Sequence, residues 1–81
     1  MKTEITLKST AGLHAALASK VVQLSSKYDA EVSIVYIDKT VDAKSILGLM
    51  SLAVPKGDNV KIVATGTDAE KALNDLKKIL G

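Results

Sequence analysis

The stretch with the clearest chemical potential is residues 10–20, because it holds the only histidine of the chain. His14 follows Gly12 in a short loop and directly precedes Ala15-Ala16, where a helical pattern begins. Imidazole has an unperturbed pKa near neutrality and is a good nucleophile when neutral. The unpaired N–H groups and the positive dipole end of a helix start attract an anion. His14 is therefore a candidate phosphoryl acceptor, and a simple helix cap or surface residue is the alternative that one histidine leaves open.

Size and composition restrict the protein to one small globular domain spanning residues 1–81. The chain is 47% hydrophobic and 25% charged, which is typical of a globular fold. It has no cysteine and one histidine, and its carboxylates show no metal-ligand spacing, so we expect no metal and no cofactor. Its apolar runs are shorter than the ~20 residues of a membrane span, and no export signal is visible. We therefore expect a cytoplasmic protein without membrane insertion.

Two further functional classes are disfavoured by the side chains present. The net charge is only +2, the eleven basic residues are scattered lysines, and the only aromatic residues are Tyr28 and Tyr36. Base readout and base stacking rely on arginine and aromatic side chains, so nucleic-acid binding is not indicated. No Ser-His-acid arrangement follows from the spacing, and a two-layer domain of this size has little depth for a substrate pocket. Hydrolytic activity is therefore not expected.

Apolar periodicity predicts seven elements in the order β-α-β-β-α-β-α, which is the α+β fold class with helices on one side of a sheet. The predicted strands are residues 2–8, 31–37, 40–42 and 60–65, and the predicted helices are residues 15–27, 46–52 and 69–80. Asp38-Lys39 is predicted as the turn between the second and third strands. Ser45 is the expected N-cap of the short helix, and Thr67-Asp68-Ala69-Glu70 has the pattern of a capping box before the last helix.

Two stretches are more specific than these general patterns: Gly-Leu-His-Ala at residues 12–15 and Val-Asp-Ala-Lys-Ser-Ile-Leu-Gly-Leu-Met-Ser-Leu-Ala-Val at residues 41–54. Together they resemble the histidine-containing phosphocarrier family HPr of the bacterial sugar phosphotransferase system. Lys56-Gly57-Asp58 and Ala72-Leu73 agree as well, so the resemblance covers essentially the whole chain. It implies an open-faced β-sandwich, with a four-stranded antiparallel sheet in the order 1-4-2-3 and three helices on one face.

The resemblance also implies a role for particular residues. His14 would accept a phosphoryl group from Enzyme I, which takes it from phosphoenolpyruvate, through the ring nitrogen nearer the backbone. The phosphoryl group would then pass to sugar-specific enzyme II components of a permease. The backbone amides of Ala15 and Ala16 would bind the phosphoryl oxygens. Such a carrier is a substrate of larger enzymes rather than an independent enzyme, and we expect a monomer.

The stretch Lys44-Ser45-Ile46 is similar to the regulatory serine site of the Gram-positive branch of the family. Ser45 would be the target of the ATP-dependent HPr kinase/phosphorylase. A phosphoserine adds nearly two negative charges, which would weaken docking to Enzyme I and favour a transcriptional regulator with basic groups. An N-capping serine explains Ser45 on structural grounds alone, and the two roles do not exclude each other.

The short helix after Ser45 is apolar nearly all round, whereas one layer of helices buries only about half of such a surface. We assign Leu49 and Leu52 to the core. The residues expected to be exposed as a partner-binding surface beside His14 are Ile46, Leu47 and Met50. The alternative is that all of them are core. Leu17 and Lys20 are further partner-binding candidates, although Leu17 could pack inward and Lys20 is too far along its helix to lie over His14.

The active centre departs from the family pattern Gly-Leu-His-Ala-Arg-Pro-Ala. Ala16 stands in the place of the arginine, Leu17 in that of the proline, and Ala11 replaces a residue that is usually polar. Charge-assisted hydrogen bonds from an arginine are worth about 1.5–3 kcal/mol. Their absence predicts phosphoryl transfer that is ~10- to 150-fold slower. We therefore expect an impaired carrier rather than an inactive one.

Two alternative functions follow from these departures. One is a regulatory binding module that acts through phosphorylated Ser45, like the catabolite-repression branch of the family. That branch lacks the histidine, whereas this chain keeps His14 and lacks the arginine. The other is an active-centre variant, natural or engineered, with impaired phosphotransfer.

Overall fold

The computed structural model describes residues 1–9 and 11–81, and Thr10, in the predicted loop before His14, lies outside them. Within these residues the predicted β-α-β-β-α-β-α order is confirmed. The elements are β1 (Lys2–Thr6), α1 (Ala15–Ser26), β2 (Glu31–Tyr36), β3 (Lys39–Asp42), α2 (Ile46–Ser51), β4 (Asn59–Thr65) and α3 (Ala69–Leu80).

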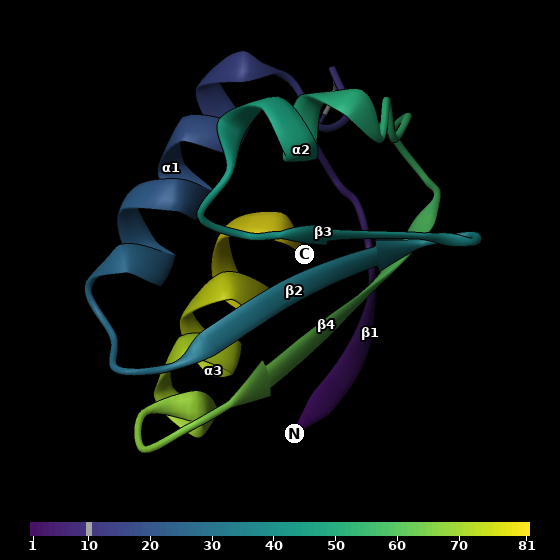
Figure 1. Ribbon diagram of the computed structural model, residues 1–81. Helices are drawn as coiled ribbons and strands as arrows, with labels where there is room; N and C mark the ends of the chain where they lie inside the picture. The colour runs from purple at the N-terminus through teal and green to yellow at the C-terminus, as the bar shows by residue number, and fades with distance from the viewer. Residues whose placement is uncertain (10) are drawn as a thin grey trace.

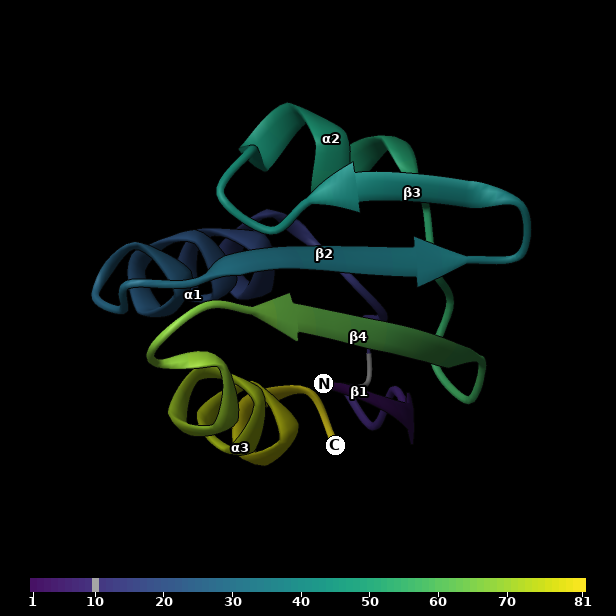
Figure 2. The same cartoon turned by 60° about the horizontal axis from the view of Figure 1, so that its bottom comes forward.

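The four strands form one antiparallel sheet in the order β1-β4-β2-β3, as expected. Ile34 at the centre of β2 pairs with Ile62 of β4 on one side and with Val41 of β3 on the other. Residues that pair directly across neighbouring strands have their side chains on the same face, so these three residues all point to the same side of the sheet. The helices lie on that side, so the sheet is open on its other face (Figures 1 and 2).

The hydrophobic core lies between the sheet and the three helices. Its fully buried large side chains come from both layers: Leu7, Ile34 and Ile62 from the sheet layer, and Val21, Leu49 and Leu76 from the helices. In Figure 1, α1 and α3 lie against the sheet, and α2 lies beside the N-terminal part of α1. The predicted inward orientation of Leu49 and Leu52 is confirmed. This packing places the start of α1 and the end of α2 next to each other.

The turn between β2 and β3 differs from the prediction by one residue. Tyr36 pairs with Lys39, so the turn residues are Ile37 and Asp38 rather than Asp38 and Lys39. Ile37 is 81% exposed and has a φ of 56°, which is unusual for a β-branched residue. The prediction was wrong because the β propensity of Ile37 was taken as evidence for a strand, whereas the pairing register of the hairpin decides.

The start of α3 also differs from the prediction. The N-cap is Asp68, whose carbonyl accepts the Ala72 N–H, and it makes no side-chain capping bond. Its carboxylate instead accepts the N–H of Asp29 at 2.8 Å, and its own N–H donates to the Asp29 carbonyl at 3.0 Å. The predicted capping box around Thr67 is therefore wrong. The side chain that could cap the helix joins the α1–β2 and β4–α3 loops.

The helices and the metal-ligating side chains of the described residues limit what the fold can do. Within residues 1–9 and 11–81, no helix has both the length and the apolar character needed to cross a membrane. The same residues contain no group of three or more His, Cys, Asp or Glu side chains close enough to hold a metal ion.

Candidate functional site

His14 lies at the boundary between the preceding loop and α1. Its backbone is extended, with φ −100° and ψ 176°, and its carbonyl accepts the Ala18 N–H at 2.8 Å, which makes it the N-cap residue. Its side chain makes no capping hydrogen bond, and the residue is exposed. The imidazole therefore does not serve as a helix cap. Its ring nitrogens face solvent, where a partner protein can reach them.

The amides that follow His14 form the positive end of α1. In an α-helix the first N–H groups have no intrahelical acceptor. Among the described residues, the N–H groups of Ala15, Ala16 and Leu17 make no hydrogen bond, and Ala15 and Ala16 are exposed. These groups and the helix dipole attract negative charge. The first turn of α1 thus offers uncommitted donors next to a nucleophilic ring.

Gly12 fixes the loop that carries His14. It has a φ of +69°, and a Cβ at this position would lie 2.3 Å from the Val54 carbonyl oxygen and 3.0 Å from the Pro55 Cα. One residue later, Leu13 donates its N–H to the same Val54 carbonyl at 2.9 Å. Only glycine combines this conformation with such a close backbone approach. His14 is consequently held beside the segment that follows α2.

The turn after α2 is also hydrogen-bonded to Leu7, which follows β1, and to Tyr36 of β2. Gly57 donates to the Leu7 carbonyl and Leu7 donates to the Asp58 carbonyl, each at 2.9 Å. The Tyr36 hydroxyl donates to the Asp58 carboxylate, and this hydrogen bond, together with burial, raises the pKa of Tyr36. The sequence pattern predicted a turn here but not its contact with the His14 loop. Gly12 was the signal, because a glycine before a helix often marks close backbone contact.

The predicted exposed surface on α2 is present. The exposed fractions are 40% for Ile46, 83% for Leu47 and 44% for Met50. We call these three residues the apolar patch. Leu17, by contrast, is only 8% exposed and packs into the core. Of the two expected positions, inward packing or exposure for partner binding, the structure shows the inward one, and Leu17 is not part of the patch.

Ser45 caps α2 as predicted. Its Oγ accepts the Gly48 N–H at 3.1 Å, and the residue is half-buried. The six residues of α2 span ~9 Å at 1.5 Å per residue. The end of α2 leads into Val54, which contacts the loop of His14. His14 and Ser45 therefore lie at opposite ends of the apolar patch rather than next to each other.

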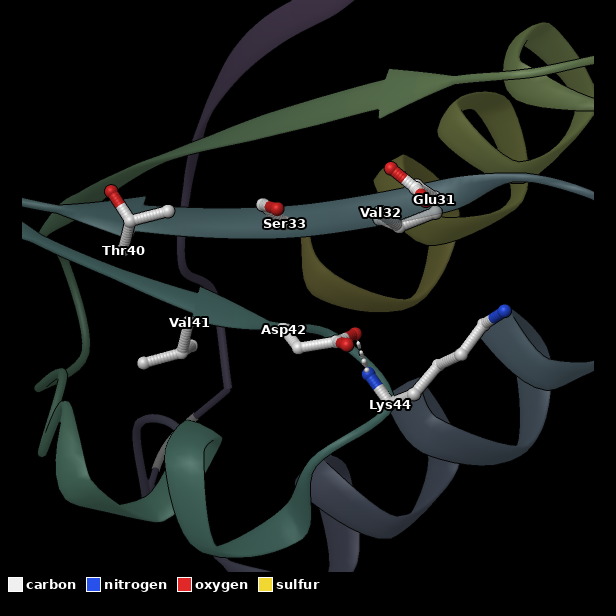
Figure 3. A pocket seen from close by; sticks show the side chains of 7 residues that line it. All are labelled: Glu31, Val32, Ser33, Thr40, Val41, Asp42 and Lys44. Carbon is white, nitrogen blue, oxygen red and sulfur yellow. Dashed lines mark hydrogen bonds between the residues drawn. The ribbon is translucent and has the colours of Figure 1, made fainter.

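Among residues 1–9 and 11–81, four hollows are lined by neither His14 nor Ser45. The hollow in Figure 3 lies along β2 and β3 and includes neither His14 nor Ser45; its lining residues are Glu31, Val32, Ser33, Thr40, Val41, Asp42 and Lys44. Lys20 lines another shallow hollow, with Leu24 of α1 and Ile79 of α3. It faces α3 and is not brought to His14, in agreement with its spacing. The exposed His14 thus lies outside these hollows, on surface that a larger protein can contact.

Comparison with known proteins identifies the family. The family described as "PTS HPr component phosphorylation site" matches residues 1–81. The chain belongs to this HPr family of phosphocarriers. Phosphocarrier protein NPr of Shewanella violacea is 36% identical over 74 residues, which are 91% of this chain and 81% of that protein. The predicted resemblance is therefore confirmed over the whole chain.

Solved structures of HPr proteins share the fold. The phosphocarrier protein HPr from Bacillus anthracis superposes with a TM-score of 0.96 at 36% identity, covering 100% of this chain and 96% of that one. The catabolite repression protein Crh of Bacillus subtilis, solved as a dimer with a swapped domain, gives a TM-score of 0.79 at 37% identity, covering 93% of this chain and 86% of that one. The open-faced sandwich expected for an HPr protein is thus confirmed.

Proposed function

We propose that this HPr-family protein accepts a phosphoryl group on His14 from Enzyme I, charged by phosphoenolpyruvate, and passes it to sugar-specific enzyme II components. The observation that carries the proposal is the exposed imidazole of His14 directly before three uncommitted backbone amides, those of Ala15, Ala16 and Leu17. A nucleophile and anion-binding donors at one point of the surface are what a phosphoryl carrier requires.

The transfer is a simple displacement. The lone pair of the His14 ring nitrogen attacks phosphorus and forms an N–P bond. The bond between phosphorus and the donor nitrogen of Enzyme I breaks, and its electron pair stays on the donor. The first amides of α1 stabilise the phosphoryl oxygens. Onward transfer is the same displacement with the His14 nitrogen as the leaving group.

The absence of an arginine at position 16 makes this proposed carrier slow. Ala16 is exposed in the first turn of α1, where its methyl group offers no charge to a phosphoryl oxygen. The backbone donors remain, because they do not depend on the side chain. The expected transfer is therefore ~10- to 150-fold slower than that of a carrier with the arginine, but not absent.

A reconstituted relay tests this proposal. Purified Enzyme I, the enzyme II components, phosphoenolpyruvate and sugar are mixed with the wild-type chain, and sugar phosphate is measured over time. The expected result is sugar phosphate formation that depends on the chain and is lost in His14→Ala. Lys71→Gln, an exposed change near the start of α3 and at the far end of α1 from His14, is the matched control and should leave the rate unchanged. Equal rates with wild type and His14→Ala would contradict the carrier function.

Ser45 is proposed as the regulatory site, modified by the ATP-dependent HPr kinase/phosphorylase. Its position at one end of the apolar patch supports this, since a phosphate there would bring negative charge to the surface that we propose for docking. Enzyme I docking would weaken and a regulator with basic groups would bind. Kinase treatment with ATP should add an acid-stable phosphoryl group to wild type and none to Ser45→Ala. Modification of Ser45→Ala to the same extent would contradict the assignment.

The second candidate function is a regulatory binding module without phosphoryl transfer. The similarity to Crh, described as a catabolite repression protein, favours it. The substitution Ala16→Arg separates the two functions. A large gain in His14 phosphorylation means that the rest of the active centre is intact and supports the carrier. No gain means that this surface serves another purpose. We propose a monomer, and light scattering during gel filtration tests this against the dimeric form known for Crh.

A further inference from the structure

The proposed phosphoryl site has no positively charged side chain in the first turn of α1. A charge that pairs with the phosphoryl oxygens must therefore come from another part of the fold. The basic residues of the chain are all lysines. A useful lysine must lie near the loop of residues 11–14 and on the same side of the molecule as His14. This question rests on the proposed carrier function.

Three other lysines near the site are held elsewhere in the fold, Lys20 and Lys44 by the hollows that they line and Lys8 by its backbone. Lys20 is six residues beyond His14, which is ~9 Å along the helix and on its opposite side, and it lines the hollow against α3. Lys44 lies beside Asp29 and Gly66, at the far end of α1, and Figure 3 shows its side chain extending away from α2. Lys8 is tied through its N–H to the Leu80 carbonyl at the end of α3.

Lys56 is in a different position. Its backbone nitrogen lies 3.2 Å from the Cβ position of Gly12, so its segment is in direct contact with the loop that carries His14. Adding one bond on each side places the Lys56 Cα within ~6 Å of the Gly12 Cα. The His14 N–H donates to the Gly12 carbonyl at 3.1 Å, a tight turn that shortens the distance between these two residues. Because Gly12 is only two residues from His14, an extended Lys56 side chain and the His14 imidazole can both reach one phosphoryl group.

The Lys56 backbone is also held firmly. Val54 accepts from Leu13 and Gly57 donates to Leu7, so both flanks of Lys56 are hydrogen-bonded to the segment that leads into His14. The carboxylate of Asp58, the nearest acidic group in sequence, accepts the Tyr36 hydroxyl. The Lys56 residue is exposed, which leaves its long side chain free to turn toward His14.

We propose that Lys56 is a catalytic residue of phosphoryl transfer in this chain and supplies part of the positive charge that position 16 lacks. Its ammonium group pairs with the phosphoryl oxygens during transfer and in the phosphorylated protein. It stays protonated throughout, so the bonds made and broken are only those of the displacement at phosphorus. An ammonium does this as a point charge, without the bidentate geometry of an arginine.

The first test compares rates of His14 phosphorylation by Enzyme I in matched variants. Lys56→Gln removes the charge and keeps the length, and Lys71→Gln on α3 and Lys8→Gln are the controls. We expect Lys56→Gln to be roughly tenfold slower than wild type and both controls to be unchanged. In the Ala16→Arg background, Lys56→Gln should have little effect, because the arginine supplies the charge. Equal rates for the three glutamine variants would overturn the proposal. It would also be overturned if Lys56→Gln lowered the rate as much in the Ala16→Arg background as in wild type.

A second test does not depend on Enzyme I. Phosphoramidate, a small phosphoryl donor, charges histidine directly, and the phosphoryl resonance is then followed by phosphorus NMR as the pH changes. A paired ammonium favours the doubly charged phosphoryl group. The phosphoryl pKa should therefore be higher in Lys56→Gln than in wild type and Lys71→Gln. Superimposed titrations would overturn the role of Lys56. If wild type is charged by phosphoramidate but not by Enzyme I, the proposed function fails and the role of Lys56 is still decided.

Discussion

The contact between Gly12 and the segment after α2 predicts a large and specific loss of stability in Gly12→Ala. An alanine at a φ of +69° costs ~1–2 kcal/mol from its backbone conformation alone. Its Cβ would also lie 2.3 Å from the Val54 carbonyl oxygen, which must move away. That movement breaks the Leu13–Val54 hydrogen bond, worth ~0.5–1.5 kcal/mol, and overpacks the site at a cost of ~1–3 kcal/mol. The sum is about 4 kcal/mol.

Gly57→Ala is the matched control. Gly57 also has a positive φ, +93°, but a Cβ there meets nothing within 4 Å. Only the conformational cost of ~1–2 kcal/mol applies to it. The chain has no tryptophan, so urea unfolding is best followed by far-ultraviolet circular dichroism. At a slope of ~1 kcal/mol per molar urea, the two midpoints should differ by roughly 2–3 M, with Gly12→Ala the less stable.

The outcome of this comparison bears on the active centre as well as on stability. If the two variants unfold at the same urea concentration, the close approach of Gly12 to Val54 is not present in solution. This contact would then hold neither His14 beside the segment after α2 nor Lys56 beside His14.

Three further predictions concern activity, capping and pH. Ala16→Arg should raise the rate of His14 phosphorylation by Enzyme I ~10- to 150-fold, and an unchanged rate would contradict the explanation of slow transfer. Ser45→Ala should lower the free energy of unfolding by ~1 kcal/mol, because Gly48 loses its acceptor, whereas Ser45→Thr should lose less; equal losses would contradict the cap. Hydrogen bonds to carboxylates raise the pKa of Tyr28 and Tyr36 in the folded chain above 10.0. Their contribution to stability is therefore complete below pH 10 and is lost as the pH rises through the folded values, and ultraviolet titration of tyrosinate in folded and urea-unfolded protein should show the difference.

The elements were predictable from the sequence because each has a consistent local pattern. The alternation in β4 and the single apolar face of α3 leave little choice of structure. The cap at Ser45 and the exposure of Leu47 followed from local chemistry and from the limited burial available to a short apolar helix. The order of the strands required the family resemblance, since pairing partners are distant in the sequence.

The features that were mispredicted or missed depend on contacts between distant segments. The Ile37–Asp38 turn is set by the register of the whole hairpin, and the Asp68 carboxylate is used by another loop instead of its own helix. The approach of Lys56 to the His14 loop joins segments more than forty residues apart. No local pattern contains such information. Gly12 indicates that another segment approaches closely, but the sequence does not show which segment it is.

The most direct test of the central claim is phosphorylation of the chain by Enzyme I and phosphoenolpyruvate, followed by intact mass. Because the N–P bond of phosphohistidine is acid-labile, each sample is measured before and after brief acid treatment. The account predicts that wild type gains one phosphoryl group, that acid removes it, and that His14→Ala gains none. A phosphoryl group that survives acid, or one that forms equally well in His14→Ala, would contradict the assignment of His14 as the carrier residue.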